Sequence, residues 1–469
     1  MPQCPKFLVL ATLVFSLGAS RVLAQQVYAT IHGTVTDSSG AVVPGAKVMA
    51  LNTATGISTS AKTDGAGYYI FPQLGIGGPY ILDITAPGFQ KFESTGLTLN
   101  LNDNRDIDAN LQIGQSTQTV QVQATAVQVE TSDTQLKSAI SGEAIATIPL
   151  LGRDASQLEK TAPGVVESSD RFGSFSANGS QTGNNSFLLD GADFNDGPLQ
   201  DQGVTINPDA LAEIDIVTST LNPEFARNAG AVVNETLKSG SNALHGGAFY
   251  YYRDTFLNNG DYFSQPGQRP PFHQNLYGGT LGGPVIKNRL FFFLAYQGYR
   301  NRTGTTQQTP VLTPSQLAGD FTADQNQVTG GTNGTTGLST NPIPFAIGSC
   351  VAGTPWNACS SGMLAPSSFN SIAANLVNKF VPAANVTSGG TSFYSFPTAD
   401  TGAQDQGVIR ADYHMSQNDS LWGSSVFESR PFAQSLPFLG ATLPGFGMVN
   451  TSHTKIFNGS YTHTFNPTT

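Results

Sequence analysis

The sequence predicts a mostly β protein in three parts: an N-terminal β-sandwich, a mixed α/β domain, and the first part of an antiparallel transmembrane β-barrel. Composition is the first reason. Only 12% of the 469 residues are charged, against about one quarter in soluble domains, whereas the chain holds 51 Gly, 29 Phe and 14 Tyr. Short segments of alternating polarity, separated by turn residues, are the second. Both suit β-structure whose outer faces meet something other than water.

Charge balance and motif content exclude several classes of function. The net charge is -10 and the isoelectric point is near 5.0, so the chain lacks the basic stripe that binds nucleic acid. Its six histidines are scattered, and neither a phosphate loop nor a nucleophile elbow is present. We therefore expect no enzymatic activity, no cofactor, no metal and no nucleic-acid partner. Acidic residues cluster twice, and calcium at the second cluster is the alternative to turn-forming acids: Asp103, Asp106, Asp108 and Asp190, Asp193, Asp196.

Residues 1–24 are predicted to be a signal peptide. Lys6 precedes an apolar stretch from Phe7 to Leu17, and a small-residue cleavage pattern ends at Ala24. A helical anchor is the alternative, but this stretch is shorter than the roughly 20 residues that a span needs. No later segment is apolar for that long, so a membrane-embedded chain would have to form a barrel.

Residues 25–113 are predicted to form a small β-sandwich. Ile31 and Val35 alternate with polar residues, and Leu97, Leu99 and Leu101 repeat the pattern. Turn residues separate these segments, at Asp37–Gly40, Pro44–Gly45, Asp64–Gly65 and Pro87–Gly88. Several short strands at such spacing are typical of a sandwich.

Three motifs in this segment resemble the carboxypeptidase-regulatory-like domain, whose fold is a transthyretin-like sandwich. They are Gly33–Asp37, Pro44–Val48 and Thr63–Phe71, and they follow the family's order. The resemblance implies an accessory domain without a peptidase site.

Residues 114–130 are predicted to be a linker, too polar to form a core of its own. Within it, Thr119, Val120, Gln121, Val122, Gln123 and Ala124 place alternating valines on an extended backbone. A peptide that adds to a sheet edge has this form, because backbone hydrogen bonds supply its affinity. The segment resembles the TonB box of energised outer-membrane receptors, which implies pairing with a TonB-type energy-coupling protein. An ordinary edge strand is the alternative.

Residues 131–242 are predicted to be a mixed α/β domain. Helices are expected at Ser141–Ile148 and Ala155–Lys160, each followed by a proline that stops it. A strand over Phe187–Leu189 runs into a tight turn, and a helical turn over Pro208–Glu213 precedes a strand at Ile214–Val217.

Six motifs in this domain resemble, in order, the plug of TonB-dependent receptors, and above all the Oar-like branch, which carries the sandwich in front. They are Ile148–Arg153, Pro163–Val165, Leu188–Asp193, Glu213–Val217, Glu224–Arg227 and Leu237–Asn242. Glu235 and Leu237 depart from the pattern, since small or β-branched residues are expected there. The departure puts the local strand geometry in doubt, but not the assignment.

Residues 243–469 are predicted to be the first part of an outer-membrane β-barrel. In one candidate strand Arg410 and Asp412 share a face, while Ile409 and Tyr413 share the other. Outer-membrane barrel strands place charged side chains inward and apolar side chains outward, although the strands of a soluble sandwich also alternate in polarity. The aromatic run Phe249–Tyr252 is predicted to lie at a membrane interface. The strand candidates are His245–Arg253, Gln274–Gly283, Leu290–Tyr299, Gln406–Met415, Ser420–Ser429 and Lys455–Phe465.

Connection lengths favour the barrel. Long connections at Asp254–His273, Arg300–Asp405 and Arg430–Thr454 alternate with short ones at Pro284–Arg289 and Ser416–Asp419. Outer-membrane barrels place long loops outside and tight turns in the periplasm. The loop over 300–405 is either an external ligand-capturing loop or an unordered insertion. Its two cysteines either pair or, alternatively, hold zinc, and they are Cys350 and Cys359.

About six strands cannot close around a plug, because plugged transporter barrels have about 22. We therefore expect this sequence to be the N-terminal part of a longer receptor.

Taken together, the resemblances imply an Oar-like TonB-dependent receptor in outer-membrane lipid, with the sandwich and plug on the periplasmic side. An unidentified external peptide, protein or glycan would be taken up with energy from the inner membrane. The alternative is a surface adhesion or scaffold protein whose sandwich binds carbohydrate or protein without transport. A soluble secreted protein is a third interpretation, which the apolar outer faces at Ile409, Phe457 and Tyr461 disfavour.

Overall fold

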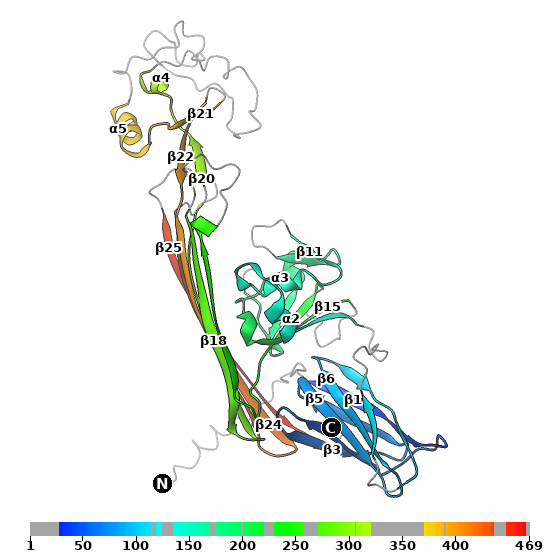
Figure 1. Cartoon of the computed structure of the whole chain (residues 1–469). Helices are drawn as coiled ribbons and strands as arrows, with labels where there is room; N and C mark the ends of the chain where they lie inside the picture. The colour runs from blue at the N-terminus through cyan, green and yellow to red at the C-terminus, as the bar shows by residue number, and fades with distance from the viewer. Residues whose placement is uncertain are drawn as a thin grey trace, which may run out of the picture.

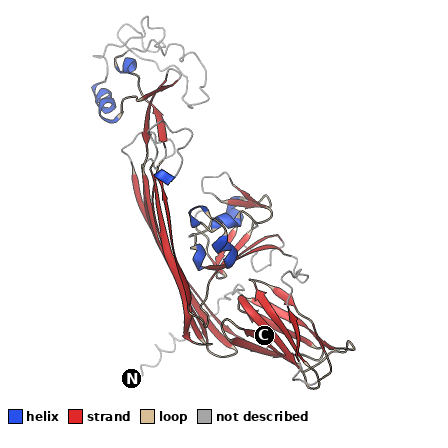
Figure 2. Cartoon of the chain, viewed as in Figure 1, coloured by secondary structure: helices blue, strands red, loops and turns tan. Residues whose placement is uncertain are grey.

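The computed structural model describes residues 28–114, 119–123, 135–168, 174–197, 200–219, 229–257, 271–304, 306–319, 370–388, 391–435 and 447–465. Figure 1 shows a long sheet, a mixed α/β domain beside it, and a sandwich at one end of that sheet. Strands dominate throughout (Figure 2), so the predicted fold class is confirmed. The predicted signal peptide and all three cysteines lie outside the described residues. No helix in the described part has the length and hydropathy of a transmembrane span.

The sandwich consists of two sheets. The first has the order β4-β1-β7, with β8 also paired to β1, and the second has the order β3-β2-β5-β6-β9. The predicted alternation is confirmed, because Ile31, Val35, Leu97, Leu99 and Leu101 are all buried. The strands are β1 (Ala29–Asp37), β2 (Lys47–Asn52), β3 (Ile57–Lys62), β4 (Tyr68–Leu74), β5 (Gly77–Thr85), β6 (Lys91–Leu99), β7 (Asn104–Asp106), β8 (Ala109–Leu111) and β9 (Thr119–Gln123).

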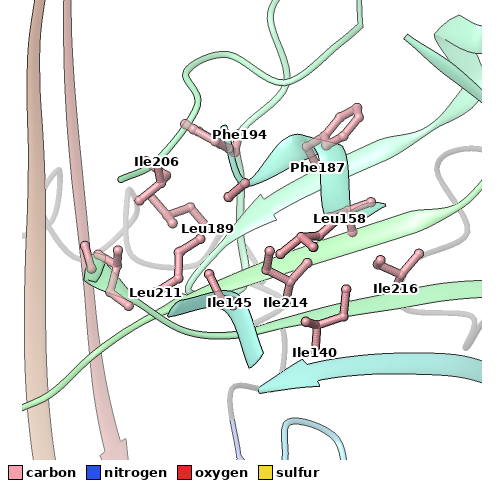
Figure 3. Packing of buried hydrophobic residues seen from close by; sticks show 14 of the residues in the cluster. Ile140, Ile145, Leu158, Phe187, Leu189, Phe194, Ile206, Leu211, Ile214 and Ile216 are labelled. Carbon is pink, nitrogen blue, oxygen red and sulfur yellow. The ribbon is translucent and has the colours of Figure 1, made fainter. Parts of the chain in front are cut away.

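The α/β domain is built on a five-stranded sheet with the order β10-β15-β16-β13-β14. Its core, in Figure 3, joins side chains from the sheet and the short helices, including Ile145, Leu158, Phe187 and Ile214. Its elements are β10 (Leu136–Ser141), α2 (Gly142–Thr147), η1 (Leu151–Arg153), α3 (Ser156–Glu159), β11 (Val165–Glu167), β12 (Phe175–Ala177), η2 (Thr182–Asn184), β13 (Ser186–Leu189), β14 (Ala192–Asp193), η3 (Pro208–Ala210), β15 (Leu211–Ser219) and β16 (Val232–Leu237).

The predicted helices of this domain are present. Two details differ from expectation: Ser141 caps the first helix instead of belonging to it, and the helical turn at Pro208 is shorter than predicted. The Ser141 side chain caps α2 by accepting a hydrogen bond from the Ala144 N–H. The helical turn ends at Ala210 rather than Glu213, because the following residues pair with β16 from Leu211 onward. The doubt about the strand at Glu235 is also resolved. β16 pairs in regular register with β13 over Val232–Glu235, and Glu235 is buried in it. Its pairing with β15 has a register shift between Thr236 and Leu237, so the expected irregularity is present at Leu237.

The barrel part is a six-stranded antiparallel sheet with the order β17-β18-β19-β23-β24-β25. All six predicted strands are confirmed, and five of them extend well beyond the predicted limits because backbone pairing continues past the clean polarity alternation. In one hairpin, for instance, the pairing reaches Phe272 and Thr303. The strands are β17 (His245–Asp254), β18 (Phe272–Ile286), β19 (Leu290–Thr303), β23 (Asp400–His414), β24 (Asp419–Gln434) and β25 (Met448–His463).

The long connection between β19 and β23 carries structure of its own, at the end of the sheet opposite the sandwich (Figure 1). Its described parts contain a three-stranded sheet and two helices, so they are not an unordered insertion. The elements are β20 (Thr306–Pro310), α4 (Pro314–Leu317), α5 (Ser371–Phe380), β21 (Val386–Ser388) and β22 (Thr391–Pro397). A short helical turn, η5 (Thr255–Leu257), follows β17.

The aromatic run on β17 does not form a single belt. Phe249 and Tyr251 lie on the face toward the α/β domain, where the Arg153 guanidinium stacks 5.0 Å and 5.1 Å from their ring centroids. Tyr250 and Tyr252 occupy the other face, since successive strand residues point to opposite sides. The prediction of an interface belt therefore fails for half of the run, because a plug arginine binds those rings.

Candidate functional site

The α/β domain is fixed to the barrel sheet by a buried ion pair. Leu189 and Ala192 pair across the two-residue turn Asp190–Gly191, whose φ values of 50° and 77° are those of a tight hairpin. This turn projects the Asp190 carboxylate onto β23, where Arg410 donates to it at 2.7 Å. The side chain of Asp190 is 0% exposed, so its charge depends on that partner.

The neighbours of this pair complete its hydrogen bonding. Asp190 also accepts from the Leu237 N–H at 3.0 Å and from the Ser424 hydroxyl at 3.0 Å. Arg410 pairs with Asp412 at 3.0 Å and stacks over the Trp422 ring. The cluster links strands from both domains and its groups are largely satisfied. It therefore holds the α/β domain against the barrel sheet.

A second contact lies further along β23. Gln406 accepts from the Asn207 N–H at 2.8 Å and donates to the Thr205 carbonyl at 2.9 Å. The same amide donates to Glu428 on β24 at 2.9 Å. Gln406 and Arg410 are four residues apart, and they point the same way as predicted for the inward face. Ile409, between them, is 48% exposed on the outer face.

Arg153 makes the third contact between plug and barrel. It donates to Asp209 at 2.7 Å and to the Tyr251 hydroxyl of β17 at 2.9 Å. The motif Ile148–Arg153 thus ends in a residue that reaches the first barrel strand, and its φ of 54° aims it there.

The segment that leaves the plug passes very close to the barrel backbone. A Cβ atom on Gly240 would lie 2.4 Å from the Phe292 carbonyl oxygen and 2.6 Å from that of Gly283. Ser239 beside it donates to Asp412 at 2.6 Å. The motif Leu237–Asn242 therefore needs glycine at this point for a steric reason.

The sandwich contacts the plug through the loop that directly follows β6. Glu213 on β15 accepts from the Leu101 N–H at 3.0 Å, and Asp215 accepts from the Asn102 side chain at 3.3 Å. Lys137 on β10 lies 3.6 Å from Asp103. Burial raises the pKa of Glu213 to about 8, with the nearby Asp215 adding to the effect and the Leu101 N–H opposing it.

The sandwich also contacts the short turns of the barrel. Asn242 donates from its backbone to the Ala54 carbonyl at 3.0 Å and from its side chain to the Thr55 carbonyl at 2.6 Å. The Asn242 side chain also exchanges two hydrogen bonds with Asn288, in the turn between β18 and β19. A cavity of about 860 Å³ lies between sandwich, plug and these turns.

The TonB-box-like segment is placed on the sandwich. Thr119–Gln123 forms β9, which pairs in parallel with β6 from Lys91↔Thr119 to Thr95↔Gln123. β9 is the last strand of that sheet. Ala124 lies outside the described residues. The segment is extended as expected, and it is held by the preceding domain.

Two buried carboxyl groups lie inside the plug. Burial raises the pKa of Glu235, and burial together with Glu235 raises the pKa of Glu159 well above its usual range. Both groups therefore favour the protonated form at neutral pH. Among the described residues, no group of three or more His, Cys, Asp or Glu side chains is placed to hold a metal. The alternative calcium site is not assembled there, since the Asp190 carboxylate faces Arg410.

The sequence pointed to some of these residues only indirectly. Asp190 and Arg410 were each assigned to a motif or a strand face, but nothing connected positions 220 residues apart. An inward arginine on a barrel strand is a signal that an acid faces it. Glu213 and Asn242 each belonged to a motif, but nothing connected either residue with the sandwich. Asn288 had no signal, because polar residues at turns are common.

Comparison with known proteins shows what the chain is similar to. Residues 236–469 match the family described as outer membrane beta barrel domain, and residues 30–112 match the carboxypeptidase regulatory-like domain. The chain is 27% identical over 287 residues to the TonB-dependent transporter Oar of Myxococcus xanthus. The chain is a homologue of TonB-dependent outer-membrane receptors. This receptor homologue is an outer-membrane protein, and the alignment spans 57% of it but only 26% of Oar.

Solved outer-membrane proteins are also similar to the receptor homologue. The transporter YddB from Escherichia coli matches 69% of the chain and 36% of its own length, at 13% identity and a TM-score of 0.40. A ferric enterobactin receptor from Pseudomonas aeruginosa matches 69% of the chain and 38% of its own length, at 14% identity and a TM-score of 0.36.

Proposed function

We propose that the chain is the N-terminal part of a receptor that binds an external ligand and takes it up with energy from a TonB-type coupling protein. The buried cluster around Asp190 and Arg410, which we propose to be a lock between plug and barrel, carries the proposal. A domain that fills the inner face of a barrel sheet and is fixed there by Asp190 and Arg410 blocks passage until the lock opens. Homology to a TonB-dependent transporter supports the same function.

The orientation follows from the connections. The long insertion between β19 and β23 lies at one end of the sheet, and the sandwich and short turns lie at the other. Long loops of outer-membrane barrels are external, so the proposal places the sandwich and plug on the periplasmic side. We propose domain limits of 25–113 for the sandwich, 114–130 for the linker, 131–242 for the plug and 243–469 for the barrel part.

In this proposal Thr119–Ala124 is the segment that pairs with the coupling protein. A strand that is paired through its backbone can transmit a pulling force along the chain. The coupling protein needs only a free strand edge to pair with it. The external ligand would be a peptide, protein or glycan captured by the outer loops. The proposal assigns no catalytic residue.

Binding of the purified periplasmic domain of the coupling protein to the full-length receptor tests this role. Val122→Pro removes a backbone N–H from the segment, so binding should be lost. Val127→Pro, in the same linker but outside the segment, is the matched control. If the unmodified receptor does not bind the coupling domain, the proposal is wrong and the adhesion or scaffold alternative is favoured.

A further inference from the structure

We propose that the sandwich presents β9 to the coupling protein without releasing it, so that the partner strand becomes the next strand of the sandwich sheet. The inference rests on the proposed function, since it assumes that the Thr119–Gln123 segment is the coupling strand. Its partner is an extended strand of the coupling protein that has one edge free.

The position of β9 in its sheet is the first observation. The order β3-β2-β5-β6-β9 puts β9 at the end, with β6 on one side and no described strand on the other. In a paired strand, alternate residues direct their N–H and C=O groups to opposite edges. Pairing with β6 therefore uses one edge of β9 and leaves the other edge available for a partner.

The regular register of β9 is the second observation. All five residues pair in sequence with Lys91–Thr95, with no bulge. Fixing the backbone of a free segment costs conformational entropy, and here β6 has already fixed the backbone of β9. A partner that adds to docked β9 avoids that cost, whereas a partner that first strips β9 from β6 also loses the existing hydrogen bonds.

The connection from β6 to the plug is the third observation. β6 ends at Leu99, and the next residues contact Glu213 on β15 and Lys137 on β10. A pull on docked β9 therefore reaches the plug sheet through the sandwich as well as through the linker. If β9 were released, the pulling force could reach the plug only through the linker.

A disulfide that pins β9 to β6 tests the inference. Glu93 and Gln121 are direct neighbours in the parallel register. Adjacent strands are about 4.8 Å apart, which is within the Cα separations of about 4.4–6.8 Å that disulfides span. The full-length receptor with Glu93→Cys and Gln121→Cys, and with its native cysteines changed to serine, is compared in oxidised and reduced forms. The probe is the purified periplasmic domain of the coupling protein.

The inference expects the oxidised receptor to bind the probe as tightly as the reduced one, or more tightly. Binding that disappears on oxidation and returns on reduction overturns it, because release of β9 is then required. Absence of binding by both forms and by the unmodified receptor is a different failure, that of the proposed function itself.

Hydrogen exchange of the unmodified receptor gives a second measurement that needs no variant. Amides of Lys91–Thr95 should stay protected when the coupling domain binds, because β6 keeps its partner. Faster exchange in this segment on binding means that β9 has left β6, and it overturns the inference even if the disulfide variant does not fold.

Discussion

Arg410 shows how a single side chain in this protein depends on another domain. Its guanidinium is 11% exposed and lies between Asp190 of the plug and Asp412 of its own strand. Two buried carboxylates and one guanidinium are stable together only while the hydrogen bonds from Ser424, Ser239 and Leu237 are also made. The ion pair between Arg410 and Asp190 therefore forms only while the plug is seated against the barrel sheet.

Arg410→Met should destabilise the seated plug. The substitution keeps the length of the side chain but leaves Asp190 as an uncompensated buried charge, which costs about 3–5 kcal/mol. Denaturant unfolding of the refolded full-length receptor in detergent measures the loss. Arg289→Met, at an exposed turn arginine, is the control and should have little effect. Adding Asp190→Asn to Arg410→Met should restore part of the stability, and an equal loss in the double variant would refute the ion-pair argument.

Glu213 should make docking of the sandwich on the plug dependent on pH. Its pKa is raised from 4.5 to about 8 by burial, so the docked state holds the proton more tightly than the undocked state. Docking is then strongest below pH 4.5 and weakens as the pH rises toward 8.

Glu213→Gln keeps an acceptor for the Leu101 N–H but cannot ionise, so docking should no longer change over this range. The measurement is hydrogen exchange of the Leu101 amide between pH 5 and 8, corrected for the intrinsic rate. Glu143→Gln, on the exposed side of α2, is the control and should retain the original pH dependence. A pH profile that Glu213→Gln leaves unchanged would assign the effect to another group.

Among the elements, the link from β16 to β17 has little steric freedom. It carries the chain from the plug to the first barrel strand, and it crosses β18 and β19 so closely that only glycine fits at position 240. Hydrogen bonds on both sides hold it, from Ser239 to Asp412 and from Asn242 to Asn288. Its geometry therefore sets where the plug can sit relative to the sheet.

Gly240→Ala should reduce the fraction of correctly folded receptor. The new methyl group would meet backbone atoms of Phe292 and Gly283, which cannot move without breaking strand pairing. Heat-modifiable migration in detergent gels measures the folded barrel. Gly247→Ala is the matched control, since no atom lies within 4 Å of its added Cβ. Equal folding of the two variants would contradict the steric argument.

Across the whole molecule, the sandwich contacts both other parts. It touches the plug through the loop after β6 and the barrel turns through Ala54 and Thr55. Both contacts are polar and small, unlike the apolar core that plug and barrel share through Val408 and Val426. Such an interface can open without unfolding either partner.

Asn242→Ala should loosen the sandwich from the barrel turns while leaving both domains folded. The variant loses the side-chain hydrogen bonds to Thr55 and Asn288. Hydrogen exchange over residues 54–57 should then become faster, because that loop keeps only the backbone hydrogen bond from position 242 to the Ala54 carbonyl. Asn110→Ala, whose side chain bonds only within the sandwich, is the control. Unchanged exchange over 54–57 in Asn242→Ala would show that this contact does not hold the domain.

The sequence by itself determined the local elements and their class. Polarity alternation indicated the barrel strands at Gln406–Met415 and Lys455–Phe465, and turn residues located the sandwich strands, because each pattern depends on neighbours only a few residues away. The inward face of Gln406–Met415 was also determined in this way. Element limits were less certain, since pairing along β18 and β19 continues where alternation fades.

Tertiary structure alone decided which distant groups meet. The contacts of Asp190 with Arg410, of Glu213 with Leu101, and of β9 with β6 join residues whose local patterns are independent of each other. The contact of Arg153 with Phe249 and Tyr251 on β17 is of the same kind. The polarity pattern of a strand determines to which face a side chain points. Which residue it contacts on that face is determined by the packing of the whole chain.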